Sequence, residues 1–345
     1  MADNEKKKIR FIVNPISGTE KKKDLAPLIR QRIDPSLYEA EICMTQRAGH
    51  AVDLAREAAA AGYYAAVAVG GDGTVNEVGR GVLHTSTALG IIPCGSGNGL
   101  ARHLHIPLDA AKALSALNDG IVSPIDYGLV EGHPFFCTCG VGFDALVSFR
   151  FSTDKRRGLL TYLEKALYEF LKYRPETYEL ETEDGIIRHK AFLITCCNAS
   201  QYGNNAFISP RASLHDGLLD ITILEPFTAV EIPGMVFQLF NKLILQNSRI
   251  RSFQCRELTI HRKQPGVAHF DGDPVLLSAD IPVRIVQGGL QVVTPRHVEY
   301  APIEQVQNFI NPVIEEVATF NRQTLARNIE FLKSLFRKRL PPAGK

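Results

Sequence analysis

The chain has 345 residues, of which 45% are hydrophobic and 22% are charged, and its formal net charge is +2. These values indicate a globular protein of about two domains with a large buried core, and such a small charge gives no sign of a nucleic-acid partner. No apolar run reaches the roughly 18–20 residues of a membrane span, and residues 1–8 do not form a signal peptide, so a cytoplasmic protein is expected.

The first part of the chain alternates apolar strands with helical segments up to about residue 128. Residues 9–13 form a predicted strand that leads into Asn14-Pro15-Ile16-Ser17-Gly18. Helices are predicted over residues 22–33 and 50–61, and the apolar run 65–69 is the next strand. This alternation is typical of a parallel sheet that helices cover.

A glycine turn follows the strand at residues 65–69 and precedes a helix predicted over residues 75–83. Its sequence is Gly70-Gly71-Asp72-Gly73-Thr74-Val75-Asn76-Glu77. Glycines let consecutive backbone N–H groups point at one anion, and a helix start adds partial positive charge. A carboxylate there would repel a bare phosphate, so Asp72 is expected to work through a metal or to take up a proton. The alternative is a tight turn without a ligand.

A second loop of the same kind is Gly95-Ser96-Gly97-Asn98, between a strand at residues 88–92 and a helix that begins near Leu100. A further helix is predicted over residues 109–117. Three strand ends with small polar turns favour an open α/β sheet, whose ligands bind beyond the carboxyl ends of the strands. Neither the P-loop pattern nor the dinucleotide pattern GxGxxG is present.

These three motifs, in this order and spacing, closely resemble the diacylglycerol kinase catalytic domain. The chain is most similar to the soluble bacterial lipid kinases, which are related to sphingosine and ceramide kinases, over about residues 8–300. The resemblance implies ATP binding by Asn14, Pro15, Ser17, Gly18, Thr45, Gly70, Gly71, Asp72, Gly73, Thr74, Asn76, Glu77, Gly95, Ser96, Gly97 and Asn98. For Thr45, a place in the N-cap region of the next helix is an equal alternative.

After Asp126 the pattern changes to short strands, predicted at residues 135–139, 177–182, 191–197, 219–224, 257–261 and 282–286, with one long helix at 159–173. Such strands suggest an antiparallel sandwich. The predicted fold class is therefore α/β with two domains: a three-layer α/β nucleotide-binding domain at residues 1–128 and a mainly antiparallel β-sandwich, the lipid-binding domain, at 129–290. Residues 291–345 are expected to return to the first domain and end in a basic helix.

Two Asp-Gly pairs stand out in this second part. Asp216-Gly217 reads as a turn before the strand at residues 219–224. The resemblance instead implies a Mg²⁺ ion bound by the Asp216 side chain and by the carbonyl groups of Ser213 and Leu218, an oxygen-only set that suits this metal.

The second pair lies in Phe270-Asp271-Gly272-Asp273, which is either a plain hairpin turn or a general-base pair. Like charges raise the proton affinity of one carboxylate, and on an extended backbone both side chains would face the same cleft. The family has Asp-Gly-Glu here and its second acid is the usual proposed proton acceptor. This chain has the shorter Asp273, which leaves Asp271 and Asp72 as alternative bases.

The C-terminal segment combines an apolar stripe with positive charge. Leu325, Ile329, Leu332, Phe336 and Leu340 recur at helical spacing, and residues 322–345 hold seven basic side chains against one acidic. Such a helix either docks on its own core or contacts an anionic membrane.

The resemblance implies a lipid kinase that needs ATP and Mg²⁺ and phosphorylates diacylglycerol, a sphingoid base or ceramide. It would serve phospholipid metabolism as a cytoplasmic protein peripherally associated with the membrane. The alternatives are an NAD kinase-like phosphotransferase and a non-catalytic lipid- or nucleotide-binding regulator. The oligomeric state stays open, with a homodimer as one alternative.

Overall fold

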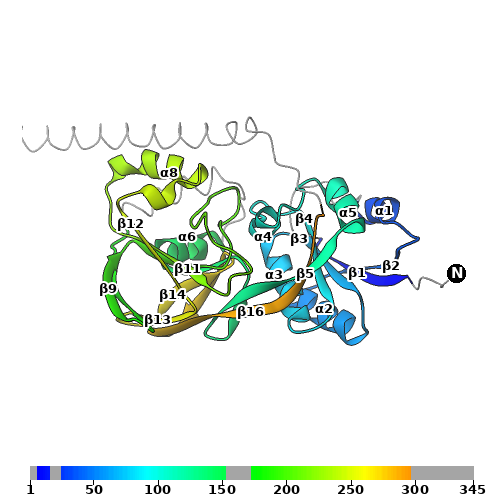
Figure 1. Cartoon of the computed structure of the whole chain (residues 1–345), viewed down its shortest axis with the longest axis horizontal. Helices are drawn as coiled ribbons and strands as arrows, with labels where there is room; N and C mark the ends of the chain where they lie inside the picture. Colours follow the sequence, from blue (N-terminus) through cyan, green and yellow to red (C-terminus); the bar gives the residue numbers. More distant parts are fainter. Residues whose placement is uncertain (1–5, 16–24, 153–171, 297–345) are drawn as a thin grey trace, which may run out of the picture.

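The computed structural model describes residues 6–15, 25–152 and 172–296, and two β-sheets carry these residues (Figure 1). Residues 159–171 of the helix predicted at 159–173 lie outside the described residues, as do the basic C-terminal segment, Ser17 and Gly18.

The first half of the chain is an α/β unit of three layers. Its elements are β1 (Lys7–Val13), α1 (Leu25–Arg32), β2 (Tyr38–Met44), α2 (His50–Ala60), β3 (Ala65–Gly70), α3 (Asp72–Val82), β4 (Ala88–Pro93), α4 (Gly99–His103) and α5 (Ala110–Asn118). The strands β2-β1-β3-β4 are parallel in that order. Figure 1 shows α1 and α5 on one side of this sheet and α2 and α3 on the other.

Strands β3 and β4 are buried at every residue, because helices cover both faces of the sheet. Helix α3 begins at Asp72, three residues earlier than predicted. Gly71 is its extended N-cap, so Asp72, Gly73 and Thr74 form the first turn of the helix. A negative side chain is favourable at that position because it faces the positive end of the helix dipole.

The second half adds a sandwich of two sheet layers. Its elements are β5 (Ile121–Val130), β6 (His133–Phe135), β7 (Thr138–Gly142), α6 (Phe143–Ser152), β8 (Glu176–Thr182), β9 (Gly185–Ala191), β10 (Leu193–Cys197), β11 (Leu219–Leu224), η2 (Ala229–Glu231), α8 (Ile232–Phe240), η3 (Ile244–Gln246), β12 (Ile250–Cys255), β13 (Glu257–His261), β14 (Gly266–Phe270), β15 (Asp273–Leu277) and β16 (Asp280–Thr294).

One layer is a separate antiparallel sheet in the order β12-β11-β10-β7-β14-β15. The other layer continues the first sheet beyond β4 through β16, β13, β8 and β9, with β5 and β6 joined to β16. Val141 and Ile221 of one layer pack in one core with Leu180 and Ile281 of the other. The predicted mixed α/β and antiparallel β architecture is therefore confirmed.

Strand β16 is common to both halves. It pairs antiparallel with β13 and β5 and, near its end, parallel with β4 through Val292 and Leu89. The predicted strand at residues 282–286 is only its first part. The strand also runs across the predicted boundary at residue 290, and the predicted domain limits stay predictions.

Two predicted strands are interrupted in the structure. Residues 135–139 divide into β6 and β7, because the N–H groups of Phe136 and Cys137 donate to Asp271 instead of a neighbouring strand. Residues 191–197 divide at Phe192 between β9 and β10. Cys137, Cys139, Cys196 and Cys197 are buried free thiols, whereas Cys43, Cys94 and Cys255 are half-buried.

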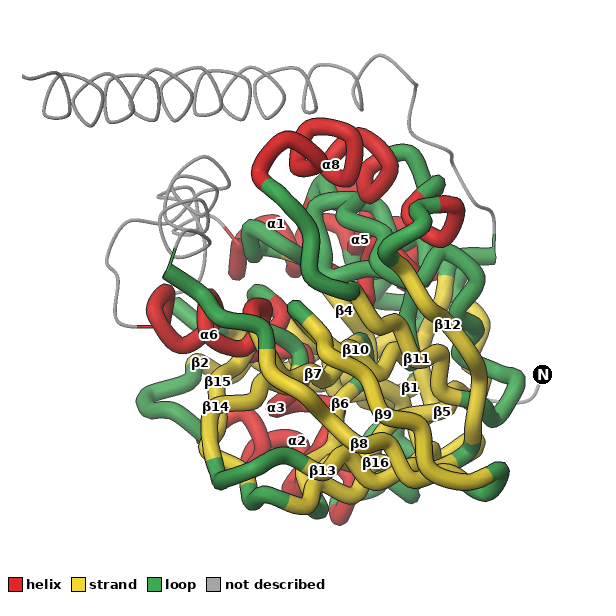
Figure 2. Tube along the Cα trace, turned by 90° about the vertical axis from the view of Figure 1, so that its left-hand side faces the viewer, coloured by secondary structure: helices red, strands yellow, loops and turns green. Residues whose placement is uncertain are grey.

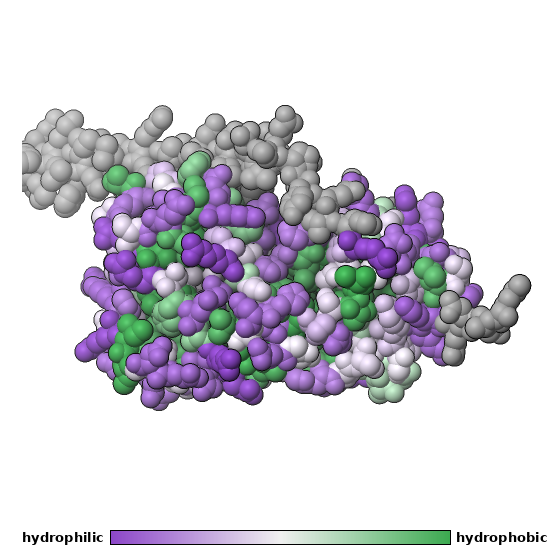
Figure 3. Space-filling view, in the orientation of Figure 1, coloured by the Kyte–Doolittle hydropathy of each residue, from purple (hydrophilic) through white to green (hydrophobic). Residues whose placement is uncertain are grey.

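The described surface in the view of Figure 3 is mostly hydrophilic, with scattered apolar residues. No helix in the described part of the chain is long and apolar enough to cross a bilayer.

Candidate active site

Three strand ends meet at the carboxyl edge of the parallel sheet. A Cβ atom built on Gly95 would lie 2.5 Å from the Cα of Gly71, so the two glycine loops touch. The Asn14 side chain, after β1, donates to the Thr74 hydroxyl at 3.2 Å. The described residues of the three strand-end motifs therefore lie together, as expected.

Three other predicted ATP-binding residues flank this edge. Thr45 follows β2, and its N–H donates to the Val13 carbonyl. The N-cap of α2 is Gly49 rather than Thr45. Pro15 is exposed after β1, and Ser96 is exposed in the second glycine loop.

Asp72 joins the two glycine loops. Its carboxylate accepts hydrogen bonds from the N–H groups of Asn98 at 2.8 Å and Gly99 at 2.6 Å. Burial raises the pKa of Asp72, and these two donors oppose that rise. The Asn98 side chain in turn accepts from the Gly95 N–H and donates to the Gly95 carbonyl. The loop at residues 95–99 is therefore held in shape by Asn98 of its own motif and by Asp72 of the first motif.

Two residues at the end of the first motif bind protein groups. Glu77 accepts from the N–H groups of Gly49 and Ala51 at the start of α2. Asn76 is buried and donates to Asp271, in the second half of the chain, at 2.8 Å. The motif residue Asn76 therefore bridges the two halves beside the glycine turn.

Asp271 lies in a two-residue hairpin turn, because Phe270 pairs with Asp273 across β14 and β15. Asp271 and Gly272 both have positive φ, 48° and 86°, as a type I′ turn requires. The expectation of an extended backbone with both acids facing the same way is therefore wrong.

The Asp271 carboxylate turns back toward the segment between β6 and β7. It accepts from the N–H groups of Phe136 at 2.8 Å, Cys137 at 2.7 Å and Thr138 at 3.1 Å, and from the Asn76 amide. Burial raises the pKa of Asp271, whereas these four donors oppose the rise. With its lone pairs engaged, Asp271 is suited to hold the turn rather than to exchange protons.

Asp273 has a different environment. Its Oδ2 atom lies 3.7 Å from the position that a Cβ atom on Gly73 would take, so it faces the first turn of α3. No hydrogen bond to its carboxylate is present among the described residues. Desolvation, followed by the charges of Asp271 and Asp72, raises the pKa of Asp273 to about 6. That value suits a general base near neutral pH.

The predicted metal loop forms a turn before β11. The exposed Asp216 carboxylate accepts from the Leu218 N–H at 3.1 Å, and Asp126 holds the neighbouring Gly217 N–H at 2.8 Å. Ser213 lies in the same loop and is half-buried. One carboxylate with nearby carbonyl groups is a donor set that Mg²⁺ accepts. Within residues 6–15, 25–152 and 172–296, no three acidic, His or Cys side chains gather as a metal cluster.

Two acids near the site were missed from the sequence. Asp126 is 4% exposed within β5 and holds both the Gly217 N–H and the Gly288 N–H of β16. Its position between Ile125 and Tyr127, as a charged residue in an apolar strand, could have indicated a buried acid with a specific role. Asp144 is the second residue of α6, and its carboxylate lies within hydrogen-bond distance of three side chains. Its contacts arise only from the fold, so no local pattern marked it.

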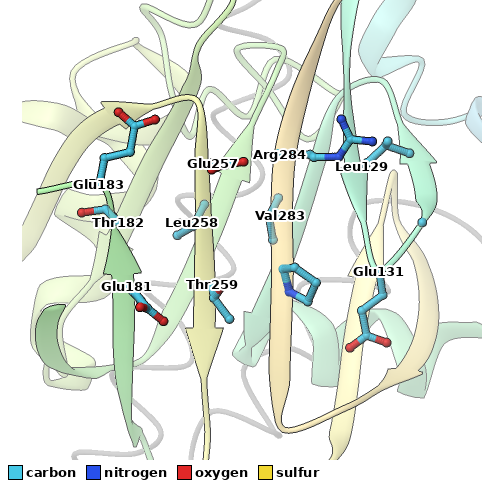
Figure 4. Close-up of a pocket in the computed structure, with 12 residues that line it drawn as sticks. Leu129, Glu131, Glu181, Thr182, Glu183, Glu257, Leu258, Thr259, Val283 and Arg284 are labelled. Carbon is cyan, nitrogen blue, oxygen red and sulfur yellow. The ribbon is translucent and has the colours of Figure 1, made fainter. Parts of the chain in front are cut away.

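A hollow of about 520 Å³ lies elsewhere, over β5, β8, β13 and β16 (Figure 4). Its lining contains four acidic residues, Glu131, Glu181, Glu183 and Glu257, and one basic residue, Arg284. None of the described residues predicted for the site lines it. The glycine loops and the turn of Asp271–Asp273 are therefore the candidate site.

Two family models match the chain. Residues 8–130 match the diacylglycerol kinase catalytic domain, and residues 137–301 match the YegS C-terminal NAD kinase beta sandwich-like domain. The two matches together cover both sheet layers and all described residues predicted for the site.

Curated proteins and solved structures agree with these matches. A diacylglycerol kinase of Bacillus subtilis (strain 168) is 33% identical over 65% of this chain and 76% of its own length. A Pseudomonas syringae pv. tomato (strain ATCC BAA-871 / DC3000) protein named "Probable lipid kinase YegS-like" is 32% identical over 75% of this chain and 85% of its own. A crystal structure of a diacylglycerol kinase from Bacillus anthracis str. Sterne has a TM-score of 0.64 at 21% identity, over 86% of this chain and 99% of that one, which shows the shared fold.

Proposed function

The chain belongs to the lipid kinase family that carries the diacylglycerol kinase catalytic domain, and on that basis we propose that it transfers the γ-phosphoryl group of ATP to the hydroxyl of a membrane lipid. Diacylglycerol is the first candidate substrate. A sphingoid base, ceramide or another lipid alcohol are the alternatives within the family.

The observation that carries this proposal is the position of Asp273, 3.7 Å from the Cβ site of Gly73 in the first turn of α3. A proton acceptor and a glycine-rich helix start therefore face each other. Phosphoryl transfer needs positioning and neutralisation of charge more than covalent chemistry. Gly71 provides no side-chain cap, which leaves the first N–H groups of α3 to bind phosphate oxygens.

In the proposed reaction Asp273 takes the proton of the lipid hydroxyl. The hydroxyl oxygen forms a bond to the γ-phosphorus while the bond from that phosphorus to the bridging oxygen breaks, so that ADP leaves. Asp271 holds the hairpin turn that carries Asp273, and Asp72 holds the loop at residues 95–99 beside the phosphates. Mg²⁺ would neutralise phosphate charge. In the loop before β11, Asp216, Ser213 and Leu218 are the proposed residues for a structural Mg²⁺.

The test is phosphoryl transfer from labelled ATP to defined acceptors. Purified protein with Mg²⁺ is offered vesicles that contain diacylglycerol, sphingosine or ceramide, and separately NAD, and the products are separated by chromatography. We expect a labelled lipid from one of the vesicle types and none from NAD. Asp273→Asn is the control, because it removes the proposed base while keeping the shape of the side chain.

Two outcomes would favour the rival functions. Labelled NADP without labelled lipid would indicate an NAD kinase-like enzyme. Binding of ATP or of lipid vesicles without product from any acceptor would indicate a non-catalytic regulator.

Because the proposed substrate lies in a bilayer, we also propose that the protein acts in the cytoplasm at the membrane surface. Sedimentation with vesicles that contain the preferred lipid tests this proposal. The protein should pellet with those vesicles and stay in the supernatant without them. The oligomeric state remains a separate proposal, and a homodimer is the state to test by light scattering.

A further inference from the structure

A buried polar network lies beside the candidate site, on the face of the six-stranded sheet that α6 covers. Its central atom is Oδ2 of Asp144, the second residue of α6. This oxygen lies 3.0 Å from the Thr195 hydroxyl, 3.1 Å from the Tyr202 hydroxyl and 3.1 Å from His269 Nε2. The Asp144 side chain is 9% exposed and that of His269 3%. A buried acid with this many contacts is costly to keep unless it organises its surroundings.

The protons of the network show how strongly it depends on Asp144. The Thr195 and Tyr202 hydroxyls also contact each other at 2.6 Å. The three contacts among these two hydroxyls and Asp144 Oδ2 therefore share only two hydroxyl protons. One hydroxyl therefore donates to Asp144 and the other to its neighbour. His269 Nε2 donates to Asp144, while His269 Nδ1 is buried without a partner among the described residues. Asp144 thus supplies the polar contact that orients the His269 ring.

The backbone leaves no spare room around this contact. Gly140 of β7 lies opposite His269 of β14 in the sheet. A Cβ atom on Gly140 would be 2.6 Å from Asp144 Oδ2 and 2.9 Å from His269 Nε2. A real Cβ atom essentially never comes this close to another heavy atom, so the carboxylate and the ring fill the space above the glycine.

On one side the network leads to the turn that carries the proposed base. His269 precedes Phe270 and the Asp271–Asp273 turn at the end of β14. One helical turn beyond Asp144, the Ser148 hydroxyl donates to the Gly272 carbonyl. Figure 2 shows α6 next to β14 and β15, which it contacts. Asp144 therefore fixes the strand before this turn, and its helix contacts the turn itself.

On the other side the network leads to the nucleotide loop. Tyr202 is followed by Gly203, where a Cβ atom would be 2.9 Å from the backbone of Gly97. The Asn204 N–H donates to the Gly97 carbonyl at 3.0 Å, and Arg102 donates to the same carbonyl and to Asn205. The segment at residues 202–205 therefore holds the second glycine loop.

We propose that Asp144 is a positioning residue that holds the turn of Asp273 and the glycine loop of Gly97 in one fixed arrangement. It acts through His269 toward the base and through Tyr202 toward the nucleotide. The inference rests on the proposed kinase function, because the two loops it joins are those assigned to the acceptor and to ATP.

The experiment compares variants that remove each arm of the network separately, where an arm is the set of contacts that runs from Asp144 through Tyr202 or through His269. Tyr202→Phe removes the arm toward Gly97 and should weaken binding of a non-hydrolysable ATP analogue with little change in kcat. His269→Leu removes the arm toward Asp273 and should lower kcat about tenfold or more with unchanged analogue affinity, because small misplacements of reacting groups are costly. Asp144→Asn should do both.

Two controls separate positioning from a general structural role. His269→Gln keeps a nitrogen donor at the place of Nε2 and should retain most of kcat. His261→Leu breaks a similar histidine–aspartate contact on β13, where His261 lies 2.7 Å from Asp280, and should change neither kcat nor analogue affinity. Melting temperatures are measured for every variant.

The proposal is overturned if Asp144→Asn keeps kcat and analogue affinity within about twofold of wild type, below the usual size of a coupling between sites. It is also overturned if Tyr202→Phe and His269→Leu lose both properties in proportion to their melting temperatures. If Asp144→Asn does not fold, the two single-arm variants decide. If wild type phosphorylates no lipid, the proposed function fails, while analogue binding by Tyr202→Phe still tests the nucleotide arm.

Discussion

Asp271 and Asp273 are separated by one residue, yet their environments suit different work. Four N–H donors surround the Asp271 carboxylate, whereas the described residues leave the Asp273 carboxylate without a hydrogen bond. A carboxylate that accepts several N–H bonds favours its charged form, and one that lies beside like charges binds a proton more readily. The pair therefore divides into a residue that shapes the turn and a residue able to exchange a proton.

We predict that Asp273→Asn lowers kcat by roughly 10²–10⁴, the usual contribution of a general base. Asp273→Glu should keep substantial activity, because it keeps a carboxylate at this position. Binding of the ATP analogue should be unchanged in both variants, since the glycine loops lie on the other half of the chain. Steady-state kinetics and calorimetric binding measure the two quantities.

Asp271→Asn is the comparison variant. It replaces an acceptor of four donors by an amide that has its own N–H groups, so we expect a lower melting temperature together with lost activity. Normal turnover by Asp273→Asn, combined with an inactive Asp271→Asn that keeps its melting temperature, would identify Asp271 as the base instead. Normal turnover in both and in the double variant would leave Asp72 as the candidate.

The raised pKa of Asp273 predicts opposite effects of pH on rate and on stability. Because the base must be ionised, kcat/KM, which reports the free enzyme, should fall on the acid side of about pH 6. The folded-state pKa lies above the ordinary value of 3.8, so ionisation destabilises the folded protein as pH rises from 3.8 to about 6. Asp273→Asn should therefore melt at a higher temperature than wild type near neutral pH, and the difference should vanish toward the acid end. A constant difference across this range would contradict the assignment.

The sequence indicated which residues would gather at the candidate site, but not which contacts they would make. The glycine turn of Asp72 and the acid pair that includes Asp273 are local patterns, and the family resemblance added Asn76. The partners of Asp271 were not predictable, since the N–H groups of residues 136–138 become donors only when two distant segments meet. Asp144 left no local signal for the same reason.

At the scale of helices, the glycines of α3 and α8 differ in how closely other atoms pack against them. A Cβ atom on Gly81 would lie 2.5 Å from the Ala55 Cβ and 2.8 Å from the Val52 carbonyl oxygen, so Gly81 lets α2 and α3 approach closely. Gly234 in α8 is exposed and has no atom within 4 Å of its Cβ position. Only the first glycine is required for packing.

We predict that Gly234→Ala stabilises the protein by about 0.5–1 kcal/mol, because alanine has the higher helix propensity. Gly81→Ala should instead destabilise it by about 1–3 kcal/mol through overpacking. Urea denaturation of the two variants measures both changes. Equal effects of the same sign would show that propensity, and not packing, governs both positions.

The loop before β11 gives a prediction about metal. If Asp216 binds Mg²⁺ in the folded protein, a chelator should lower the melting temperature of wild type in the absence of ATP, since a metal that binds only the folded state stabilises it. Asp216→Ala should melt at the same temperature with and without chelator. Equal chelator shifts in the two proteins would refute the metal site.

The bounds of a strand were predictable where an apolar run in the sequence marks them. They were less predictable where contacts between distant segments determine where the strand ends. Strands β3, β4 and β11 match their predicted ranges to within one residue. The predicted strand at residues 282–286 is only the first part of β16, which continues past the glycine pair Gly288-Gly289. In the structure this glycine pair lies at a register shift, with Gly288 at a φ of 59° and its N–H bound to Asp126.

At the scale of the whole molecule, the buried Asn76 amide is a direct bond between the two halves. It donates to Asp271 and to the Pro134 carbonyl at 3.2 Å. We predict that Asn76→Ala lowers the free energy of unfolding by about 1.5–3 kcal/mol, the usual value for a hydrogen bond to a charged group, and lowers kcat as well. Denaturation and kinetics measure the two effects.

Asn118→Ala is the matched control, because the Asn118 amide donates to the Arg32 carbonyl within the first half alone. It should cost about 0.5–1.5 kcal/mol and leave kcat unchanged. A loss of kcat equal to that of Asn76→Ala would show that the bridge between the halves has no special role.

The shared strand β16 also sets the order in which the protein can be completed during synthesis. The strand that covers the β4 edge is encoded at residues 280–294, after nearly the whole second half. While the ribosome makes the intervening residues, the edge of β4 stays unpaired, and unpaired edges promote aggregation. Pairing across such sequence separation is also slow. The nascent first half should therefore depend on chaperones until β16 emerges, and a fragment that stops after β5 should aggregate rather than fold alone.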